Sequence, residues 1–226
     1  MKTLKEKIEY LKRVETGCIV DAFLKLGIDH YSIDSLKAFG QSRKFAGAAH
    51  TAFMERPERE VKSYSRFDSI DQCEAGDVLV TAGASGRIVT GDMFAKYAEH
   101  AGLAAWIIEG KIRDSEGIDG LPMCTCCEGA SNYLWRHGTK ITALDVPVKV
   151  CGTVICPGDI LIGDSDGILV IPKERLDEVI HQVEYVVQVE SEVDGIFERG
   201  ENLAELLNDV DIRKARLRPE EEEERK

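Results

Sequence analysis

Hydrophobic positions at the start of the chain recur at intervals of three and four residues. Leu4, Ile8 and Leu11 follow this spacing, which is that of one face of an α-helix. The pattern predicts helical structure over residues 3–27, in two helices. The second helix, "CIVDAFLKLG", ends at Gly27, a residue type that commonly follows the last turn of a helix.

The same helical spacing returns near the other end of the chain. It predicts one long helix, or two consecutive helices, between residues 173 and 200, with Gly200 as the stop signal. The apolar residues on the expected buried face are Leu176, Val179, Ile180, Val183, Val186 and Val187.

Between these helical regions the pattern changes to short, continuous apolar runs, which indicate buried strands. "KFAGAAHTAFM" (residues 44–54), "DVLVTA" (77–82) and "LAAWIIE" (103–109) are runs of this kind. A short helix is expected within residues 65–77. A helix is also expected over "DMFAKYAEHAG" (92–102). Its expected apolar face consists of Met93, Phe94, Tyr97, Ala98 and Ala101, and Gly102 ends it.

The order strand, loop, helix, strand over residues 77–109 predicts a βαβ unit. Its two strands should be parallel and joined by a right-handed crossover. The connection at residues 83–92, "GASGRIVTGD", is too rich in glycine to be regular structure. Because parallel strands end at the same edge of a sheet, the segments that follow the two strands should emerge together.

The remaining segments complete one α/β domain. Residues 120–145, which include "CTCC", read as irregular, whereas residues 146–172 read as short strands joined by turns. We see no internal repeat and no linker. The sequence therefore predicts one domain over residues 1–217, followed by an acidic tail at 218–226 that contains five consecutive glutamates.

Composition narrows the classes of function. The 226 residues are 43% hydrophobic and 31% charged, with a formal net charge of -12, which argues against a nucleic-acid partner. No apolar stretch is long enough to span a bilayer, and the start of the chain lacks the apolar core of a signal peptide. We therefore expect a cytoplasmic protein without a membrane partner. Most of the seven cysteines should be free thiols in the core. The exception is "CTCC", which lacks the second ligand pair of a structural zinc site and is expected to have a redox or local role in a loop.

Charged residues lie where the two parallel strands are expected to end. Asp92 opens the predicted helix, and Arg113 and Asp114 follow the second strand in "EGKIRD". A helix N-terminus favours an anion, and a guanidinium binds a carboxylate. Aspartate oxygens suit Mg²⁺, which keeps several waters. The alternative interpretation is structural: Asp92 would complement the helix dipole, and Arg113–Asp114 would be a surface turn with a weak ion pair.

Motifs in a fixed order give these residues a context. They are "IVDAF", "FAGAAHTAF", "AGDVLV", the glycine loop with Gly91–Asp92, "EGKIRD" and "PGDILIGDSDGILVIP". In order and spacing, from about residue 18 to residue 200, the chain resembles the RraA-like family. That family includes divalent-metal-dependent 4-hydroxy-4-methyl-2-oxoglutarate aldolases and regulators of ribonuclease activity.

The resemblance implies a single-domain αββα-type sandwich of the swivelling β/β/α kind, with terminal helices, assembled as a homotrimer or hexamer. It implies that the helix start, with Gly91, Asp92, Met93 and Phe94, and Arg113 bind a small 2-oxo acid. It further implies that Asp114 and Asp92 hold Mg²⁺ or Mn²⁺. A glutamate from the C-terminal helix of a neighbouring subunit completes the site in the aldolases; Glu190 is the best match, with Glu192 in reserve.

The expected function is a class II aldolase that cleaves a 4-hydroxy-2-oxo acid to pyruvate, with Arg113, Asp92 and Glu190 as the catalytic set. The same site would also decarboxylate oxaloacetate. The ribonuclease regulators resemble the aldolases in fold but lack the aspartate that corresponds to Asp114, so its presence favours the enzyme. The alternative is a non-catalytic regulator that binds a ribonuclease or another protein. A Schiff-base aldolase using Lys111 has little support, because nothing nearby is apolar enough to depress the pKa of a lysine.

The chain departs from the family pattern after the Arg–Asp pair. The aldolases carry a proline-containing segment there, whereas this chain has "LPMCTCCEGAS". Because this segment is expected to flank the pocket, the departure bears on the half of the substrate that leaves as the second product.

Overall fold

A computed structural model describes residues 2–29, 31–133, 139–200 and 208. The chain divides into two compact units, one formed by Met1–Thr16 and His30–Glu174 and the other by Gly17–Asp29 and Arg175–Lys226. The expected tail at 218–226 lies outside the described residues.

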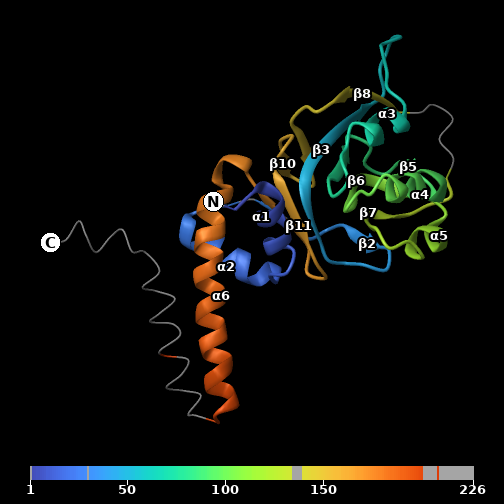
Figure 1. Cartoon of the computed structure of the whole chain (residues 1–226). Coiled ribbons are helices and arrows are strands. Elements are labelled where there is room, and N and C mark those ends of the chain that lie inside the picture. The colour runs from blue at the N-terminus through green and yellow to red at the C-terminus, as the bar shows by residue number, and fades with distance from the viewer. Residues whose placement is uncertain (1, 30, 134–138, 201–207, 209–226) are drawn as a thin grey trace. The chain divides into compact units, whose positions relative to one another are not determined.

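The first unit is built on one large mixed sheet, whose strands run in the order β1-β12-β11-β3-β4-β6-β7-β2 (Figure 1). Strands β3, β4, β6 and β7 are parallel to one another, while β11, β12 and β8 join antiparallel. The parallel pairing of β4 with β6 confirms the predicted βαβ unit. The strands are β1 (Ser32–Ile33), β2 (Lys37–Phe39), β3 (Phe45–Glu55), β4 (Val78–Ala82), β5 (Ile88–Thr90), β6 (Ala105–Ile112), β7 (Cys124–Ala130), β8 (Lys140–Leu144), β9 (Val148–Val150), β10 (Thr153–Ile155), β11 (Ile160–Gly163) and β12 (Ile168–Ile171).

Helices cover one face of the parallel strands, as Figure 1 shows for α4 and α5 beside β6 and β7. Leu79, Trp106 and Ile108 point to this face and pack with Ala98 of α4 and Ile118 of α5 in one buried cluster. Burying several large side chains here stabilises the position of both helices, at roughly 1.5–3 kcal/mol for each fully buried side chain. The helices of this unit are α1 (Leu4–Leu11), α3 (Arg66–Asp71), α4 (Asp92–His100) and α5 (Ser115–Asp119).

The opposite face of the parallel strands packs against antiparallel strands of the same sheet and against a separate two-stranded sheet formed by β9 and β10. Val80 and Ile107 of the parallel strands share a buried cluster with Val150, Leu161 and Val170 from β9, β11 and β12. Since successive side chains along a strand point to opposite faces, each central strand contributes to both clusters. The sheet is therefore curled into a half-barrel with buried cores on both faces.

The second unit contains α2 (Thr16–Leu26) and α6 (Leu176–Glu198), which confirm the two terminal helical predictions. Gly27 follows α2 with φ +61°, the left-handed conformation expected of a helix C-cap. Arg175 donates from Nη2 to the Leu26 carbonyl at 3.2 Å, which ties the end of α2 to the start of α6. No helix among the described residues has a long enough apolar stretch to cross a bilayer.

Several sequence predictions were wrong. Residues 88–90, expected to be irregular, form β5, and residues 120–145 contain both β7 and β8. The "CTCC" segment is therefore a buried strand. The predicted apolar face of α4 was correct for Ala98, which is buried, and for Phe94 and Ala101, which pack against the same cluster. It was wrong for Met93, which is 61% exposed, and it omitted the buried Ala95. The strand around "LAAWIIE" continues to Ile112.

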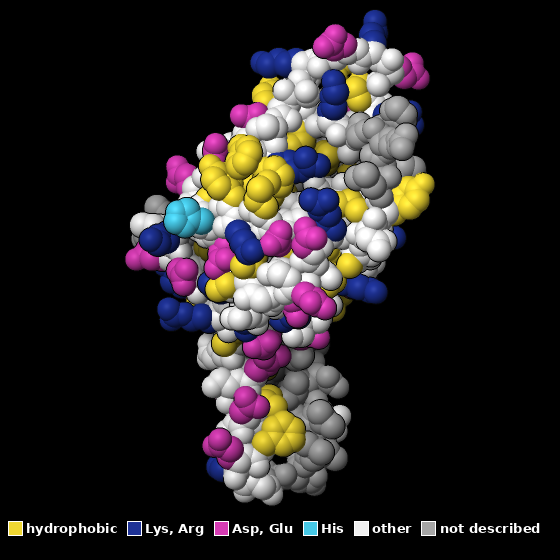
Figure 2. All heavy atoms as spheres, turned by 90° about the vertical axis from the view of Figure 1, so that its right-hand side faces the viewer, with side chains coloured by type: hydrophobic (Ala, Val, Ile, Leu, Met, Phe, Trp, Pro, Cys, Tyr) yellow, Lys and Arg dark blue, Asp and Glu magenta, His cyan; other side chains and the backbone are white. Residues whose placement is uncertain are grey.

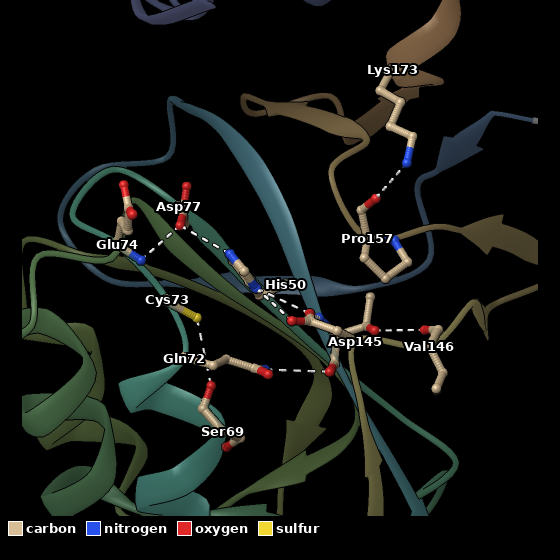
Figure 3. Close-up of polar contacts among 11 residues, drawn as sticks. His50, Ser69, Gln72, Cys73, Glu74, Asp77, Asp145, Val146, Pro157 and Lys173 are labelled. Atoms are coloured by element: carbon tan, nitrogen blue, oxygen red, sulfur yellow. Dashed lines mark hydrogen bonds and ion pairs between the residues drawn. The ribbon is translucent and has the colours of Figure 1, made fainter.

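A polar network fixes the edge at which β4 begins (Figure 3). His50 of β3 lies with Nε2 3.3 Å from Oδ2 of Asp77, just before β4, and with Nδ1 3.0 Å from Oδ1 of Asp145, just after β8. The Asp145 backbone N–H also donates to the Thr51 carbonyl at 2.8 Å. The charged residues singled out from the sequence lie at the other edge, where β4 and β6 end.

Candidate active site

Strand β5 brings the two predicted site segments together. It pairs in parallel with β6, with Ile88 opposite Lys111 and Thr90 opposite Ile112. The Arg113 N–H then donates to the Thr90 carbonyl at 3.0 Å. The residues that follow β5 and those that follow β6 therefore leave the sheet side by side, one segment entering α4 and the other α5.

These segments line one cavity of about 280 Å³. Figure 2 shows the face that carries α4 and α5, where acidic and basic side chains lie beside a patch of hydrophobic ones. The Phe67 ring packs against the rings of Phe94 and Tyr97, whose centroids lie 4.9 and 5.0 Å from that of Phe67. The predicted site residues that line the cavity are Gly91, Asp92, Met93, Phe94, Arg113 and Asp114.

Space rather than backbone conformation favours glycine at position 91, because its φ of -131° suits any residue. A Cβ atom at this position would lie 2.5 Å from Oδ2 of Asp114 and 3.1 Å from Nε of Arg113. The missing side chain lets the charged pair from β6 lie directly against the backbone at the start of α4.

Asp114 has an unusual backbone conformation for its position. It precedes α5 with φ 56° and ψ 41°, in the left-handed region, and its side chain makes no capping hydrogen bond to that helix. Aspartate tolerates this conformation better than most residues do. The carboxylate is turned toward Gly91 and Arg113, with Oδ2 3.3 Å from the arginine Nε. Both side chains are about half exposed, so the ion pair by itself adds little stability.

Asp92 is the first residue of α4 and lies close to α5. A Cβ atom added at Gly117 of α5 would lie 3.2 Å from the Cβ atom of Asp92. The Lys96 ammonium lies 2.6 Å from Oδ2 of Asp92. This hydrogen bond holds the pKa of the Asp92 carboxyl below its ordinary value. The group is therefore ionised at neutral pH. The backbone N–H groups in the first turn of α4 have no partner within the helix and favour an anion.

The donors in the cavity fit a hard divalent cation. Two carboxylates line it, and among the described residues no group of three or more His, Cys, Asp or Glu side chains is arranged to hold a metal. A structural zinc site needs four protein ligands, whereas Mg²⁺ binds through one or two carboxylates and keeps several waters. Asp92 and Asp114 therefore suit Mg²⁺ or Mn²⁺, with solvent supplying the other ligands.

Three residues of the cavity lie outside the segments that the sequence analysis singled out: Arg66, Tyr133 and Thr139. Arg66 opens α3, where Ser65 and Asp68 form a capping box that signals only a helix start. Nothing in the sequence places this helix beside the loop before α4, because that contact is decided by the tertiary fold.

Other predicted residues lie elsewhere. The three cysteines of "CTCC" are buried in β7 and do not line the cavity, but Ala130 and Ser131, at the end of the same segment, line a neighbouring pocket together with Arg113 and Asp114. Lys111 lies within β6 and is likewise not among the lining residues. Glu190 and Glu192 are on α6 in the second unit; Glu190 accepts a hydrogen bond from the Cys18 thiol at 2.9 Å, and Glu192 accepts one from Gln188. Burial, followed by this contact, raises the pKa of Cys18 to about 12.

The fold and the cavity define a mixed α/β protein with a small, charged site at the carboxyl ends of parallel strands. A family model described as RraA-like (Aldolase/RraA) matches residues 16–170. The chain belongs to the RraA-like family, and the predicted fold class is confirmed.

Relatives with names and structures extend this result. A Halalkalibacterium halodurans protein provisionally named 4-hydroxy-4-methyl-2-oxoglutarate aldolase is 27% identical over 77% of this chain and 80% of its own length. A Thermus thermophilus protein named 4-hydroxy-4-methyl-2-oxoglutarate aldolase is 30% identical over 61% of this chain and 81% of its own. The structure of Streptomyces coelicolor RraAS2, described as an unusual member of the RNase ES inhibitor RraA family, matches with a TM-score of 0.73 and 26% identity, covering 84% of this chain and 97% of that one.

Proposed function

We propose that this protein is a divalent-metal-dependent carbon–carbon lyase that cleaves a 4-hydroxy-2-oxo acid and releases pyruvate. The observation that carries the proposal is the shared cavity. It holds a guanidinium (Arg113), two carboxylates (Asp92 and Asp114) and the start of α4 within one small space. The aldolase names of two relatives support the same reaction.

Each part of the cavity has a role in this reaction. The N–H groups at the start of α4 bind the substrate carboxylate, and Arg113 donates to the keto oxygen. Removal of the C4 hydroxyl proton breaks the C3–C4 bond, and the electron pair moves into the pyruvate portion as an enolate. Arg113 stabilises the negative charge that develops on the keto oxygen, which is the interaction that lowers the barrier. Proton return to C3 completes pyruvate.

Asp92 and Asp114 would hold the cation. When bound, Mg²⁺ or Mn²⁺ supplies Lewis-acid stabilisation of the same developing charge. Decarboxylation of oxaloacetate passes through the same enolate, so we propose it as a second activity of the site.

The test is pyruvate release in a coupled assay with oxaloacetate and with 4-hydroxy-2-oxo acids. We expect turnover with Mg²⁺ or Mn²⁺, loss of turnover with a chelator, and recovery when excess cation is added. Turnover that is unaffected by the chelator would contradict the metal-dependent mechanism. The Asp114→Asn variant, which retains the shape of the residue, should remain inactive at saturating cation.

We also propose that the protein works as a homotrimer or hexamer and that Glu190 of one subunit acts at the cavity of another. In this arrangement Glu190 accepts the proton of the C4 hydroxyl through water. A mixing experiment tests the shared site. Co-assembled Arg113→Ala and Glu190→Gln subunits, each inactive alone, should recover part of the activity because some sites receive both intact residues. No recovery in a verified mixed oligomer would remove Glu190 from the site.

A non-catalytic regulator is the second candidate function. The likeness to a structure described within an RNase ES inhibitor family favours it, as does a net charge of -12 that would suit a basic protein partner. A docking protein has no need of the Arg113, Asp92 and Asp114 set. Variants at these residues should leave docking unchanged if the regulator is correct and should abolish pyruvate release if the enzyme is correct.

A further inference from the structure

The connection between β4 and β5 supplies a further arginine to the cavity. Arg87 lines the cavity, lies immediately before β5 and is half-buried. Its backbone N–H donates to the Ala84 carbonyl at 2.9 Å, and its carbonyl accepts from the Lys111 N–H of β6 at 2.7 Å. The position of the Arg87 side chain therefore depends on the turn that precedes it, at residues 83–86.

Ser85 and Gly86 form the exposed part of this turn. Gly86 has a φ of +73°, in the left-handed region that favours glycine. Among the described residues, no atom beyond its chain neighbours lies within 4 Å of the place that a Cβ on Gly86 would occupy. Because glycine has the greatest backbone freedom, the turn needs polar contacts to keep one conformation.

The carboxylate of Glu128, in β7, makes these contacts. Its Oε1 accepts from the Ser85 hydroxyl at 2.5 Å, and its Oε2 accepts from the Gly86 N–H at 2.7 Å. Hydrogen bonds to an ionised acceptor are roughly twice as strong as those between neutral groups. A side chain that is 42 residues from Gly86 in the sequence thus holds the turn directly before Arg87.

A second glutamate, Glu109 of β6, contacts the start of the same turn but divides its oxygens. Its Oε2 accepts from the Gly83 N–H at 2.9 Å, whereas its Oε1 accepts from the Cys151 N–H, between β9 and β10, at 3.2 Å. Glu128 binds the turn with both oxygens. Glu128 also falls within "LPMCTCCEGAS", the segment in which this chain departs from the family pattern. The contact with the turn is therefore a feature of this chain that the family resemblance does not supply.

The cavity that Arg87 lines favours an anion. Among the described lining residues, three guanidinium groups (Arg66, Arg87 and Arg113) accompany two carboxylates (Asp92 and Asp114). A guanidinium stays protonated in proteins, and its attraction for an anion falls with distance. A displacement of Arg87 would therefore weaken the binding of any 2-oxo acid, whether it carries one carboxylate or two.

We propose that Glu128 is a positioning residue that acts through Ser85 and Gly86 to fix Arg87 for binding of the anionic substrate. The inference rests on the proposed lyase function for the identity of the ligand, a 2-oxo acid. Glu128 is not among the residues that line the cavity, and it takes no part in bond breaking. Its effect is on ligand affinity, and the effect requires Arg87.

Pyruvate, the product of the proposed reaction, is the probe for binding by isothermal titration with Mg²⁺ present. We expect Glu128→Ala to weaken pyruvate binding about 10-fold, the lower end of the effect of a hydrogen bond to a charged group. Glu128→Gln keeps one acceptor oxygen, and Ser85→Ala removes one of the two donors, so each should weaken binding by a smaller factor. Both variants also serve if Glu128→Ala does not fold. Unchanged affinity in all three variants would overturn the inference, as would a wild type that does not bind pyruvate.

A double variant separates positioning from a general structural role. Arg87→Gln should weaken pyruvate binding at least as much as Glu128→Ala, and adding Glu128→Ala to it should cause no further loss. Losses that multiply in the double variant would show that Glu128 does not act through Arg87. Glu74→Ala is the matched control, because Glu74 is exposed before β4 and is not among the residues that line the cavity. It should bind pyruvate as the wild type does.

Kinetics with oxaloacetate distinguish failure of this inference from failure of the lyase proposal. Glu128→Ala should raise KM about 10-fold and leave kcat nearly unchanged, because the residue does not contact the reacting atoms. If the wild type turns over neither oxaloacetate nor 4-hydroxy-2-oxo acids but the coupled loss of pyruvate affinity is present, the lyase proposal fails and the positioning role stands. If turnover is present and Glu128→Ala lowers kcat at an unchanged KM, or changes neither, the positioning role fails and the lyase stands.

Discussion

Gly91, Arg113 and Asp114 depend on one another at the scale of single residues. The left-handed conformation of Asp114 turns its carboxylate away from α5, and the absence of a side chain at Gly91 makes room for it. Arg113 lies against the same glycine, with its Nε 3.1 Å from the place a Cβ would occupy. The absence of a Cβ atom at Gly91 therefore shapes the site together with the charged side chains of Arg113 and Asp114.

Replacing Arg113 with lysine tests whether the guanidinium, rather than its charge, is needed. Arg113→Lys keeps the positive charge but loses the planar pair of donors that fits an oxo acid. We expect kcat to fall by about 10²–10³, or roughly 3–4 kcal/mol, with an unchanged melting temperature. The measurement is pyruvate release at saturating substrate and cation. Near-normal turnover would show that Arg113 makes no specific contact in the transition state.

Adding one methyl group at Gly91 should separate activity from stability. In Gly91→Ala the new Cβ meets the flexible end of Asp114, so the carboxylate must move while the backbone need not. We expect kcat/KM to fall by about 10- to 100-fold, since a small displacement of a positioned group has effects of that size, with little change in melting temperature. Gly17→Ala is the matched control, because nothing lies within 4 Å of its added Cβ. Equal activities of the two variants would contradict the geometry.

At the scale of elements, two short or unexpected strands decide where the chemistry lies. Strand β5 draws the glycine-rich connection onto β6 and so places the start of α4 next to Arg113. Strand β7 takes up the "CTCC" segment, with Cys124 and Cys126 in the core on one face of the sheet and Cys127 in the core on the other. The cysteines are thus packing residues of a central strand.

Thiol labelling tests the assignment of β7. Burial raises the pKa of the Cys127 thiol to about 11 and that of Cys18 to about 12, so both are protonated and unreactive at pH 8. Cys151 is exposed in the turn between β9 and β10. We expect iodoacetamide to modify Cys151 first, and Cys124, Cys126 and Cys127 only after denaturation, as followed by peptide mass spectrometry. Rapid labelling of Cys124, Cys126 and Cys127 in the native protein would show that this segment is an exposed loop rather than a buried strand.

At the scale of the whole molecule, the cavity belongs entirely to the first of the two units. A cation held by Asp92 and Asp114 would therefore stabilise that unit directly, because a ligand that binds only the folded state favours folding by mass action. The second unit carries Glu190, the residue proposed to act on a neighbouring subunit. Assembly, rather than the single chain, would then complete the site.

Cation binding should be visible as thermal stabilisation without any turnover. At a Mg²⁺ or Mn²⁺ concentration 100 times the dissociation constant, folding should gain about 2.7 kcal/mol, and the melting temperature should rise with cation concentration. Asp114→Asn should not respond, although asparagine tolerates the same left-handed backbone. Differential scanning fluorimetry with a calcium-free cation series and an EDTA reference makes the comparison. An equal response of the variant would place the cation elsewhere.

Much of this protein could be inferred from its sequence because the relevant signals are local. Apolar spacing gave the terminal helices and α4, and apolar runs gave β3, β4 and β6. The rule that parallel strands end at one edge then predicted that Asp92 would meet Arg113 and Asp114, and the shared cavity confirms their proximity. Apolar spacing over several residues predicts an element reliably because all of the apolar residues contribute to the same buried face.

Only the tertiary structure decided the rest, since it depends on partners distant in sequence. Three residues, Ile88–Thr90, become a strand only because β6 offers an unpaired edge to them, and β7 and β8 are strands only beside β6 and β3. Arg66 reaches the cavity through contacts with Val89 and Phe94, more than twenty residues away in the chain. The sequence by itself determined which side chains could perform the chemistry, namely Arg113, Asp92 and Asp114. Long-range packing determined that Arg66 would line the same cavity.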